Sequence, residues 1–173
     1  MNNIIFLDID GVLQPIGSAD RFNHDTNALT KKFAEELDPI LETIHPLDIG
    51  AVYYDWHKPS VAYLRSLCCD CKASIVISSN WRYGQTFEQL VALFHIHELH
   101  EYVIDVTGDN DEGRAHEIKD FLDNHPSITK FVIFDDISFR GMSTLFPQQF
   151  ILCKNYITEQ DFIKASNLLK NEQ

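Results

Sequence analysis

Four short and continuously apolar runs recur along the chain, and this recurrence constrains the fold more than any other feature. The runs cover residues 3–9, 73–79, 130–136 and 149–154. Continuous apolar character is typical of strands that are covered on both faces. Because the segments between the runs carry apolar residues at helical spacing, we expect strands to alternate with helices. This alternation predicts an α/β fold, in which a mostly parallel sheet has helices on both faces.

Apolar residues spaced three or four apart predict the helices between and after these runs. The stripes comprise Val61, Leu64 and Leu67, then Phe87, Leu90, Val91 and Phe94, then Ala115, Ile118, Phe121 and Leu122, and finally Phe162, Ala165 and Leu169. Thr158 precedes the last stripe, with Asp161 three residues further on. This is a capping-box pattern, and it predicts that the last helix begins there.

Residues 14–57 do not follow the alternation of strands and helices. Helical spacing in this segment is interrupted at Asp38-Pro39, and the segment ends with the aromatic side chains Tyr53, Tyr54 and Trp56. These rings either stack on a ring of a ligand or form a small core of the segment itself. A length of 173 residues favours one domain. We expect a single domain over residues 1–173, with residues 14–57 as a small cap-like insert after the first strand.

Charge and hydropathy narrow the classes of partner. The chain has 26 acidic and 14 basic residues, a formal net charge of -12. Such a field repels polyanions, so broad binding of nucleic acid through its phosphates is disfavoured. No apolar stretch approaches the roughly 20 residues that cross a bilayer, and the N-terminus lacks the pattern of a signal peptide. We expect a cytoplasmic protein with no membrane partner.

Polar side chains end three of the four predicted strands. They are Asp8 and Asp10, Ser78 and Ser79, and Asp135 and Asp136. Ligands of open parallel sheets bind beyond the carboxyl ends of the strands, which share one edge. Carboxylates gathered there repel one another unless a cation joins them, and a hard ion such as Mg²⁺ suits oxygen ligands. The alternative is that each acid caps the helix that follows its strand.

The ordered motifs DIDGVL (residues 8–13), IVISSNWR (75–82) and VIFDD (132–136) resemble the haloacid dehalogenase-like (HAD) phosphohydrolase superfamily. The closest resemblance within it is to the HAD domain of Swiss Army knife RNA-repair proteins. The resemblance implies a three-layer Rossmannoid fold and magnesium-dependent hydrolysis of phosphomonoesters through an aspartyl-phosphate intermediate. Residues 14–57 lie outside the resemblance.

The resemblance also implies roles for the residues that end the strands. Asp8 is the expected nucleophile, and Asp10 is the expected general acid and base. Ser78 is expected to bind the phosphoryl oxygen. Asp135 and Asp136 are expected to hold Mg²⁺ together with Asp8 and the main-chain carbonyl of Asp10.

Members of the superfamily also carry a lysine or arginine that offsets negative charge, and the chain offers two candidates. Arg114 is favoured because it lies near the start of a predicted helix, whereas Lys119 is the alternative substrate-binding cation. Ser79 and Asn80 are candidate substrate-binding residues. Arg82 either binds a substrate phosphate or forms an ion pair packed with its neighbouring tryptophan.

Three functional hypotheses remain open at this point. The leading one is a phosphatase that acts on a small phosphorylated substrate, because the net charge disfavours a nucleic-acid end. A nucleic-acid end phosphatase of RNA repair and a catalytically silent binding module are the alternatives. A phospho-accepting receiver domain is disfavoured, because the strand that should end in its aspartate ends in Ser78.

Overall fold

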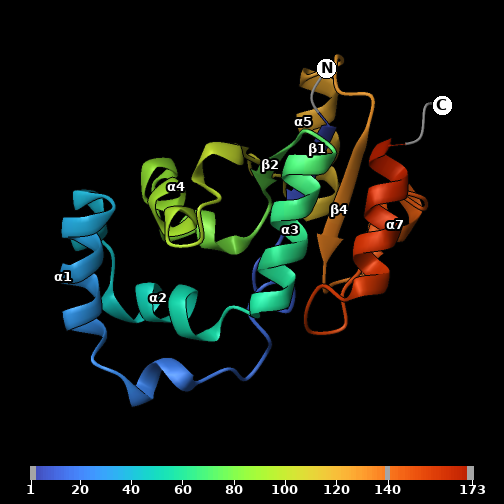
Figure 1. Cartoon of the computed structure of the whole chain (residues 1–173). Coiled ribbons are helices and arrows are strands. Elements are labelled where there is room, and N and C mark those ends of the chain that lie inside the picture. Colours follow the sequence, from blue (N-terminus) through green and yellow to red (C-terminus); the bar gives the residue numbers. More distant parts are fainter. Residues whose placement is uncertain (1–2, 139–140, 171–173) are drawn as a thin grey trace.

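The computed structural model describes residues 3–138 and 141–170. Its centre is a five-stranded, all-parallel sheet with the order β3-β2-β1-β4-β5 (Figure 1). The strands are β1 (Asn3–Leu7), β2 (Ala73–Ile77), β3 (Val103–Val106), β4 (Phe131–Asp135) and β5 (Phe150–Leu152). The first strand of the chain therefore lies in the middle of the sheet. This sheet, with helices on both faces, confirms the predicted three-layer α/β fold.

The connections between strands are mostly helical. The α-helices are α1 (Thr26–Glu36), α2 (Pro46–Gly50), α3 (Lys58–Asp70), α4 (Phe87–His95), α5 (Arg114–Asn124), α6 (Met142–Leu145) and α7 (Glu159–Lys170). Shorter turns are the 3-10 helices η1 (Asp20–Asn23), η2 (Pro39–Thr43), η4 (Asn80–Tyr83) and η5 (His100–Tyr102), and the π-helical turn η3 (Ala51–Asp55). None of the described helices is long and apolar enough to span a membrane.

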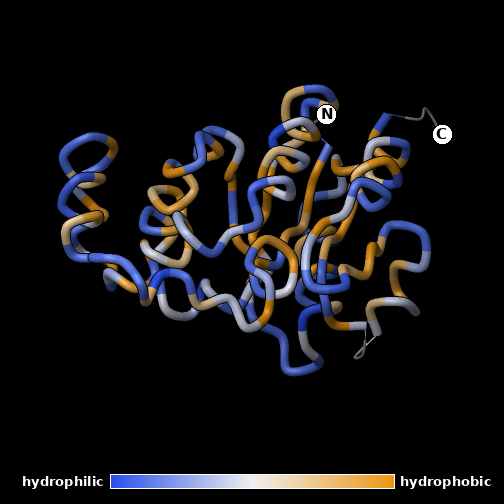
Figure 2. Tube along the Cα trace, turned by 60° about the horizontal axis from the view of Figure 1, so that its bottom comes forward, coloured by the Kyte–Doolittle hydropathy of each residue, from blue (hydrophilic) through white to orange (hydrophobic). Residues whose placement is uncertain are grey.

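Alternate side chains of β1 supply the two halves of the core. Ile5 and Leu7 belong to a buried cluster that includes residues of α3, α4 and α7, whereas Ile4 and Phe6 belong to a cluster with α5 and α6. Successive side chains of a strand point to opposite faces, so a continuously apolar strand must be covered on both sides. Figure 2 shows the hydrophobic residues concentrated along the central strands.

The start of α7 follows the predicted capping box. The backbone N–H of Thr158 donates to Asp161 Oδ2 at 2.9 Å, and the backbone N–H of Asp161 donates to Thr158 Oγ1 at 3.3 Å. These reciprocal bonds satisfy two backbone donors that the first turn of a helix leaves without partners.

Residues 14–57 contain η1, α1, η2, α2 and η3, and Figure 1 shows α1 at the end of the molecule opposite α7. The segment contributes Phe33, Leu41 and Trp56 to the same buried cluster as β1 and α3. Tyr53 packs edge-on against Phe33, with ring centroids 5.2 Å apart. The aromatic stretch of this segment therefore takes part in packing, but it joins the main core and does not form a separate small core of its own.

The sequence analysis missed β3. Its residues pair with β2 at one edge of the sheet, where Val103 is buried but Ile104 is 46% exposed. An edge strand that is open to solvent on one side does not need a continuously apolar sequence. The criterion that identified the other strands could not identify this one.

Candidate active site

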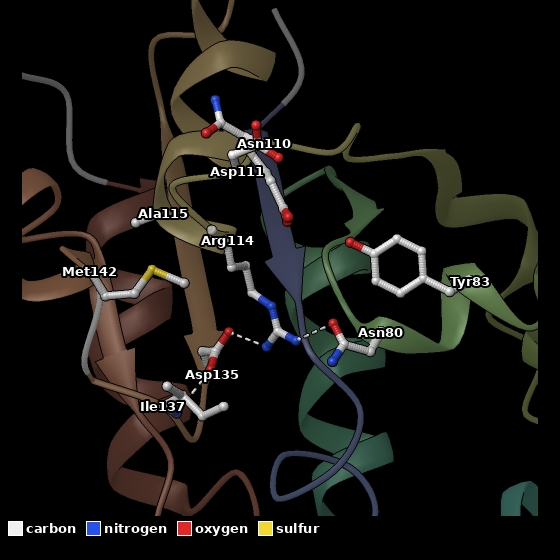
Figure 3. Close-up of a pocket in the computed structure, with 11 residues that line it drawn as sticks. Asn80, Tyr83, Asn110, Asp111, Arg114, Ala115, Asp135, Ile137 and Met142 are labelled. Atoms are coloured by element: carbon white, nitrogen blue, oxygen red, sulfur yellow. Dashed lines mark hydrogen bonds and ion pairs between the residues drawn. The ribbon is translucent and has the colours of Figure 1, made fainter.

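Two buried carboxylates meet at the carboxyl ends of neighbouring strands. Asp8 directly follows β1 and Asp135 ends β4, and these strands pair in parallel with Leu7 opposite Phe134. Arg114, the first residue of α5, reaches both of them. Its Nη1 donates to Asp8 Oδ2 and to Asp135 Oδ2, each at 2.6 Å (Figure 3 shows the contact with Asp135). A single guanidinium therefore bridges the ends of two strands.

The bridge affects the ionisation of its members. Burial alone lowers the pKa of Arg114, but the adjacent Asp8 and Asp135 carboxylates outweigh it and raise that pKa, so the guanidinium stays charged. Burial raises the pKa of Asp135 to about 6, with a further contribution from the charge of Asp8, while Arg114 opposes the rise. The two carboxylates repel each other, and Arg114 offsets part of that repulsion.

A third carboxylate, that of Asp136, completes an acidic cluster. Asp8, Asp135 and Asp136 each offer one carboxylate oxygen, and these atoms lie within 4.8 Å of one another. Gly11 makes room for Asp136: it has φ +73°, and a Cβ at that position would lie 2.5 Å from Asp136 Oδ2. Burial and the charge of Asp8 raise the pKa of Asp136. Three closely spaced oxygen ligands of this kind fit a hard divalent cation such as Mg²⁺.

Asp10 lies outside this cluster and has a partner of its own. The indole Nε1 of Trp81 donates to Asp10 Oδ2 at 3.0 Å. Burial raises the pKa of the Asp10 carboxyl, and the hydrogen bond from Trp81 partly opposes the rise. A carboxyl with a raised pKa retains its proton to a higher pH than a solvated one.

Ser78 follows β2 and is fully buried beside β1, where its backbone N–H donates to the carbonyl of Leu7 at 3.0 Å. Its hydroxyl oxygen has no hydrogen-bond partner among the described residues. A buried polar group without a partner costs free energy, so such a hydroxyl is available to a ligand. The two residues that follow are engaged: Ser79 Oγ accepts from the backbone N–H of Trp81 at 3.4 Å, and Asn80 Oδ1 accepts from Arg114 Nη2 at 3.1 Å.

Arg82 and Lys119, two predicted substrate-binding cations, have other partners in the structure. Arg82 Nη2 donates to Glu117 Oε2 at 2.7 Å, and its Nη1 donates to the carbonyls of Ser78 and Ser79 at 2.7 and 2.9 Å. Its side chain is 5% exposed, so the structure favours an ion pair over a contact with substrate phosphate. Lys119 pairs with Asp123 on α5. Of the two candidate charge-offsetting residues, Arg114 is therefore the one at the acids.

A cleft of about 450 Å³ opens beside the Arg114 guanidinium (Figure 3). Its lining residues are Asn80, Tyr83, Asn110, Asp111, Gly113, Arg114, Ala115, Glu117, Asp135, Ile137 and Met142. The sequence analysis did not identify Tyr83, Asn110, Asp111, Ile137 or Met142. The position of Tyr83 directly after the NWR run was a usable signal, whereas the others come from the loop before α5, the residues after β4 and the start of α6, and only the fold brings them together.

A protein-family model described as "HAD domain in Swiss Army Knife RNA repair proteins" matches residues 4–162. No significant match to the chain was found among curated proteins or among solved structures. The match spans both the sheet and the segment 14–57 that follows β1, so the expectation that this segment lies outside the resemblance is wrong.

Proposed function

The chain belongs to the family of HAD domains in Swiss Army Knife RNA repair proteins, and on this premise we propose that it is a magnesium-dependent phosphomonoester hydrolase. The single observation that carries the proposal is the Arg114 bridge, with 2.6 Å contacts to both Asp8 and Asp135. A cation fixed among carboxylates lowers the barrier to the approach of an anionic substrate toward an anionic nucleophile.

Asp8 is the proposed nucleophile. One of its carboxylate oxygens attacks phosphorus, and the bond between phosphorus and the leaving oxygen breaks. The product is an aspartyl phosphate on Asp8 and an alcohol. The position of Asp8 at the carboxyl end of the central strand, buried and within reach of Arg114, supports this role.

Asp10 is the proposed general acid and base. It donates its proton to the leaving oxygen, and the resulting carboxylate then removes a proton from water. That water attacks phosphorus, inorganic phosphate leaves, and Asp8 is regenerated. The raised pKa of Asp10 supports the role of acid, because the group must be protonated when the substrate arrives.

The phosphoryl oxygens are proposed to bind Ser78 and Arg114. The Ser78 hydroxyl is buried and has no partner among the described residues, which supports a role in donating to a phosphoryl oxygen. Asn80 holds the Arg114 guanidinium from the side opposite Asp135 (Figure 3). Ser79 caps η4 in the structure, so its proposed contribution to substrate binding is through the backbone.

Magnesium is proposed to bind Asp8, Asp135 and Asp136, with the main-chain carbonyl of Asp10 as a further ligand. The clustering of the three carboxylates and the space that Gly11 leaves for Asp136 support this donor set. When bound, the ion supplies positive charge that neutralises the phosphoryl group. Residues 14–57 are proposed to act as a cap-like insert within a single domain.

The test of this proposal is the hydrolysis of 4-nitrophenyl phosphate with Mg²⁺ present. We expect Asp8→Asn to abolish the reaction, because an amide is a poor nucleophile and a poor ligand for Mg²⁺. We also expect excess chelator to abolish it and added Mg²⁺ to restore it.

Lys119→Gln is the matched control. It removes a charge from the same helix that carries Arg114, but its partner Asp123 lies on the exposed face of α5. Full activity of Asp8→Asn, or activity that survives the chelator, would contradict the proposed mechanism.

A further inference from the structure

Tyr83 is an exposed aromatic residue whose ring is nonetheless held in place. The residue is 59% exposed, and it ends η4 at the wall of the cleft. The guanidinium of Arg82 lies 4.3 Å from the ring centroid, and Arg82 Nη2 donates to the Tyr83 hydroxyl at 2.7 Å. Arg82 is itself fixed by its buried ion pair with Glu117. The ring is therefore held by Arg82, which is anchored in the protein interior, although the tyrosine itself is exposed.

A guanidinium over one face of a ring leaves the opposite face for another partner. Because Tyr83 lines the cleft, a flat group inside the cleft can stack on it. A ring that is already fixed loses little conformational entropy when a ligand stacks on it, which favours binding. An exposed tyrosine without such support would lose more.

Tyr83 also lies close to the proposed phosphate site, on the Asn80 side of Arg114. Figure 3 shows Tyr83 and Asn80 on the same side of the Arg114 guanidinium, across from Met142 and Ile137. Asn80 and Tyr83 belong to the same single turn, η4, and Asn80 contacts Arg114 directly. One short helix therefore connects the cation of the proposed catalytic site to the aromatic wall of the cleft.

From this arrangement we infer that the cleft accepts a phosphomonoester whose alcohol carries a flat ring, with that ring stacked on Tyr83. A nucleoside monophosphate is the substrate class that this geometry fits. The cleft volume of about 450 Å³ lies in the range of small-molecule sites. The inference rests on the proposed function. It concerns the ring-bearing part of the alcohol, which the catalytic residues do not contact.

The aromatic residues of segment 14–57 are the alternative site on which a flat ring of the substrate could stack. Tyr53 is 41% exposed, but its ring packs edge-on against Phe33 and Tyr54, with centroids 5.2 and 4.9 Å away. It does not line the cleft beside Arg114. Tyr53 is therefore a matched control: an exposed tyrosine of the same chain that the inference leaves without a role.

Two substrates, one with a purine base and one without it, test the inference. Adenosine 5′-monophosphate and ribose 5-phosphate share the same primary phosphate ester, so the leaving oxygen is chemically equivalent. We expect kcat/KM to be roughly fivefold to 150-fold higher for the nucleotide, since stacking of one base contributes about 1–3 kcal/mol. This ratio should persist in Tyr53→Leu and fall toward one in Tyr83→Leu. It should fall only partly in Tyr83→Phe, which keeps the ring under Arg82 but loses the hydrogen bond to the hydroxyl.

A wild-type ratio near one, or a ratio that survives in Tyr83→Leu, overturns the inference. A loss in Tyr53→Leu equal to that in Tyr83→Leu also overturns it, because the platform would then lie in the insert.

Binding to an inactive protein separates the inference from the proposed chemistry. Isothermal titration of Asp8→Asn with adenosine 5′-monophosphate, with Mg²⁺ present, requires no turnover. A Kd roughly tenfold weaker in the double variant Asp8→Asn/Tyr83→Leu supports the stacking site even if no substrate is hydrolysed. Equal Kd values in the single and the double variant count against it.

Discussion

The indole N–H of Trp81 donates to Asp10 Oδ2 at 3.0 Å and so fixes the carboxyl proposed to move protons in the reaction. Trp81 follows Asn80, which contacts Arg114, and precedes Arg82, which contacts the carbonyls of Ser78 and Ser79. Three consecutive side chains of η4 therefore contact three different parts of the candidate active site.

We predict that Trp81→Phe lowers kcat about tenfold for an alkyl phosphate and much less for 4-nitrophenyl phosphate. The substitution keeps an aromatic ring but removes the donor to Asp10, and a hydrogen bond to a charged group contributes about 1.5–3 kcal/mol. Protonation by Asp10 matters most when the leaving oxygen is strongly basic. Steady-state kinetics with both substrates measure the difference.

Trp56→Phe is the matched control for this prediction. Trp56 is buried, and its indole nitrogen has no partner among the described residues, so the substitution removes no hydrogen bond. Equal losses for the two substrates in Trp81→Phe would show that Trp81 acts only through packing.

We predict that Asp10→Asn slows turnover roughly 100-fold or more while Mg²⁺ still binds, in line with the usual contribution of general acid–base catalysis. The proposed metal contact of Asp10 is its main-chain carbonyl, which the substitution preserves. Asp136→Asn is the contrasting variant, because it removes a side-chain ligand from the acidic cluster. Calorimetric titration with Mg²⁺ and kcat measurements distinguish the two. Loss of Mg²⁺ affinity in Asp10→Asn would show that its side chain is a ligand.

We predict that His97 makes the folded state less stable as the pH falls from 7.5 to 5, an effect opposite in sign to that of Asp135, whose raised pKa favours protonation of the folded protein. His97 Nε2 lies 2.8 Å from the carbonyl of Val52, and because a carbonyl only accepts, this nitrogen carries the proton of a neutral ring. Burial lowers the pKa of His97 below its ordinary value of 6.5. The unfolded chain therefore takes up a proton first, and stability present above pH 6.5 is lost as the pH falls through the folded pKa.

Urea unfolding at both pH values measures this effect. His97→Gln keeps a side-chain donor but cannot take up a proton near neutrality. Between pH 7.5 and 5 its free energy of unfolding should therefore fall less, or rise more, than that of the wild type. An equal or larger fall in the variant contradicts the assignment.

We predict that a nucleoside monophosphate has a higher kcat/KM than an oligonucleotide with a 3′- or 5′-phosphate. The net charge of -12 repels polyanions, and the Arg82 guanidinium is already engaged by Glu117. Assays of both substrates at moderate and at high salt measure the preference. If the oligonucleotide is better by tenfold or more at moderate salt, the nucleic-acid end is the preferred substrate.

Much of the fold could be predicted because a strand that is buried on both faces has a continuously apolar sequence. A strand such as β1 must be apolar at every position, and its acidic ending then stands out. β3 left no such trace, because Asp105 interrupts its apolar run and Ile104 is exposed, whereas β5 at the other edge keeps Phe150 and Ile151 buried. The fold class predicted that Asp8 and Asp135 share one edge of the sheet, but their direct proximity follows from the strand order, which places β1 beside β4.

The cleft was not predictable in the same way. Arg82 and Arg114 are equally cationic in the sequence, yet one is held in an ion pair by Glu117 and the other contacts Asp8. Which of two cations reaches a site depends on the packing of α5 against η4, and no short motif records that packing. The role of Tyr83 depends in turn on Arg82, so it could be inferred only from the structure.

The position of Arg114 between Asp8 and Asp135 has a consequence for how the protein folds. The chain carries its own counter-ion for these buried carboxylates, so their mutual repulsion is offset before any metal arrives. If Mg²⁺ binds the acidic cluster as proposed, assembly of the scaffold does not depend on the ion. A chelator should then end catalysis while the chain stays folded, whereas Arg114→Met should make folding itself depend on Mg²⁺.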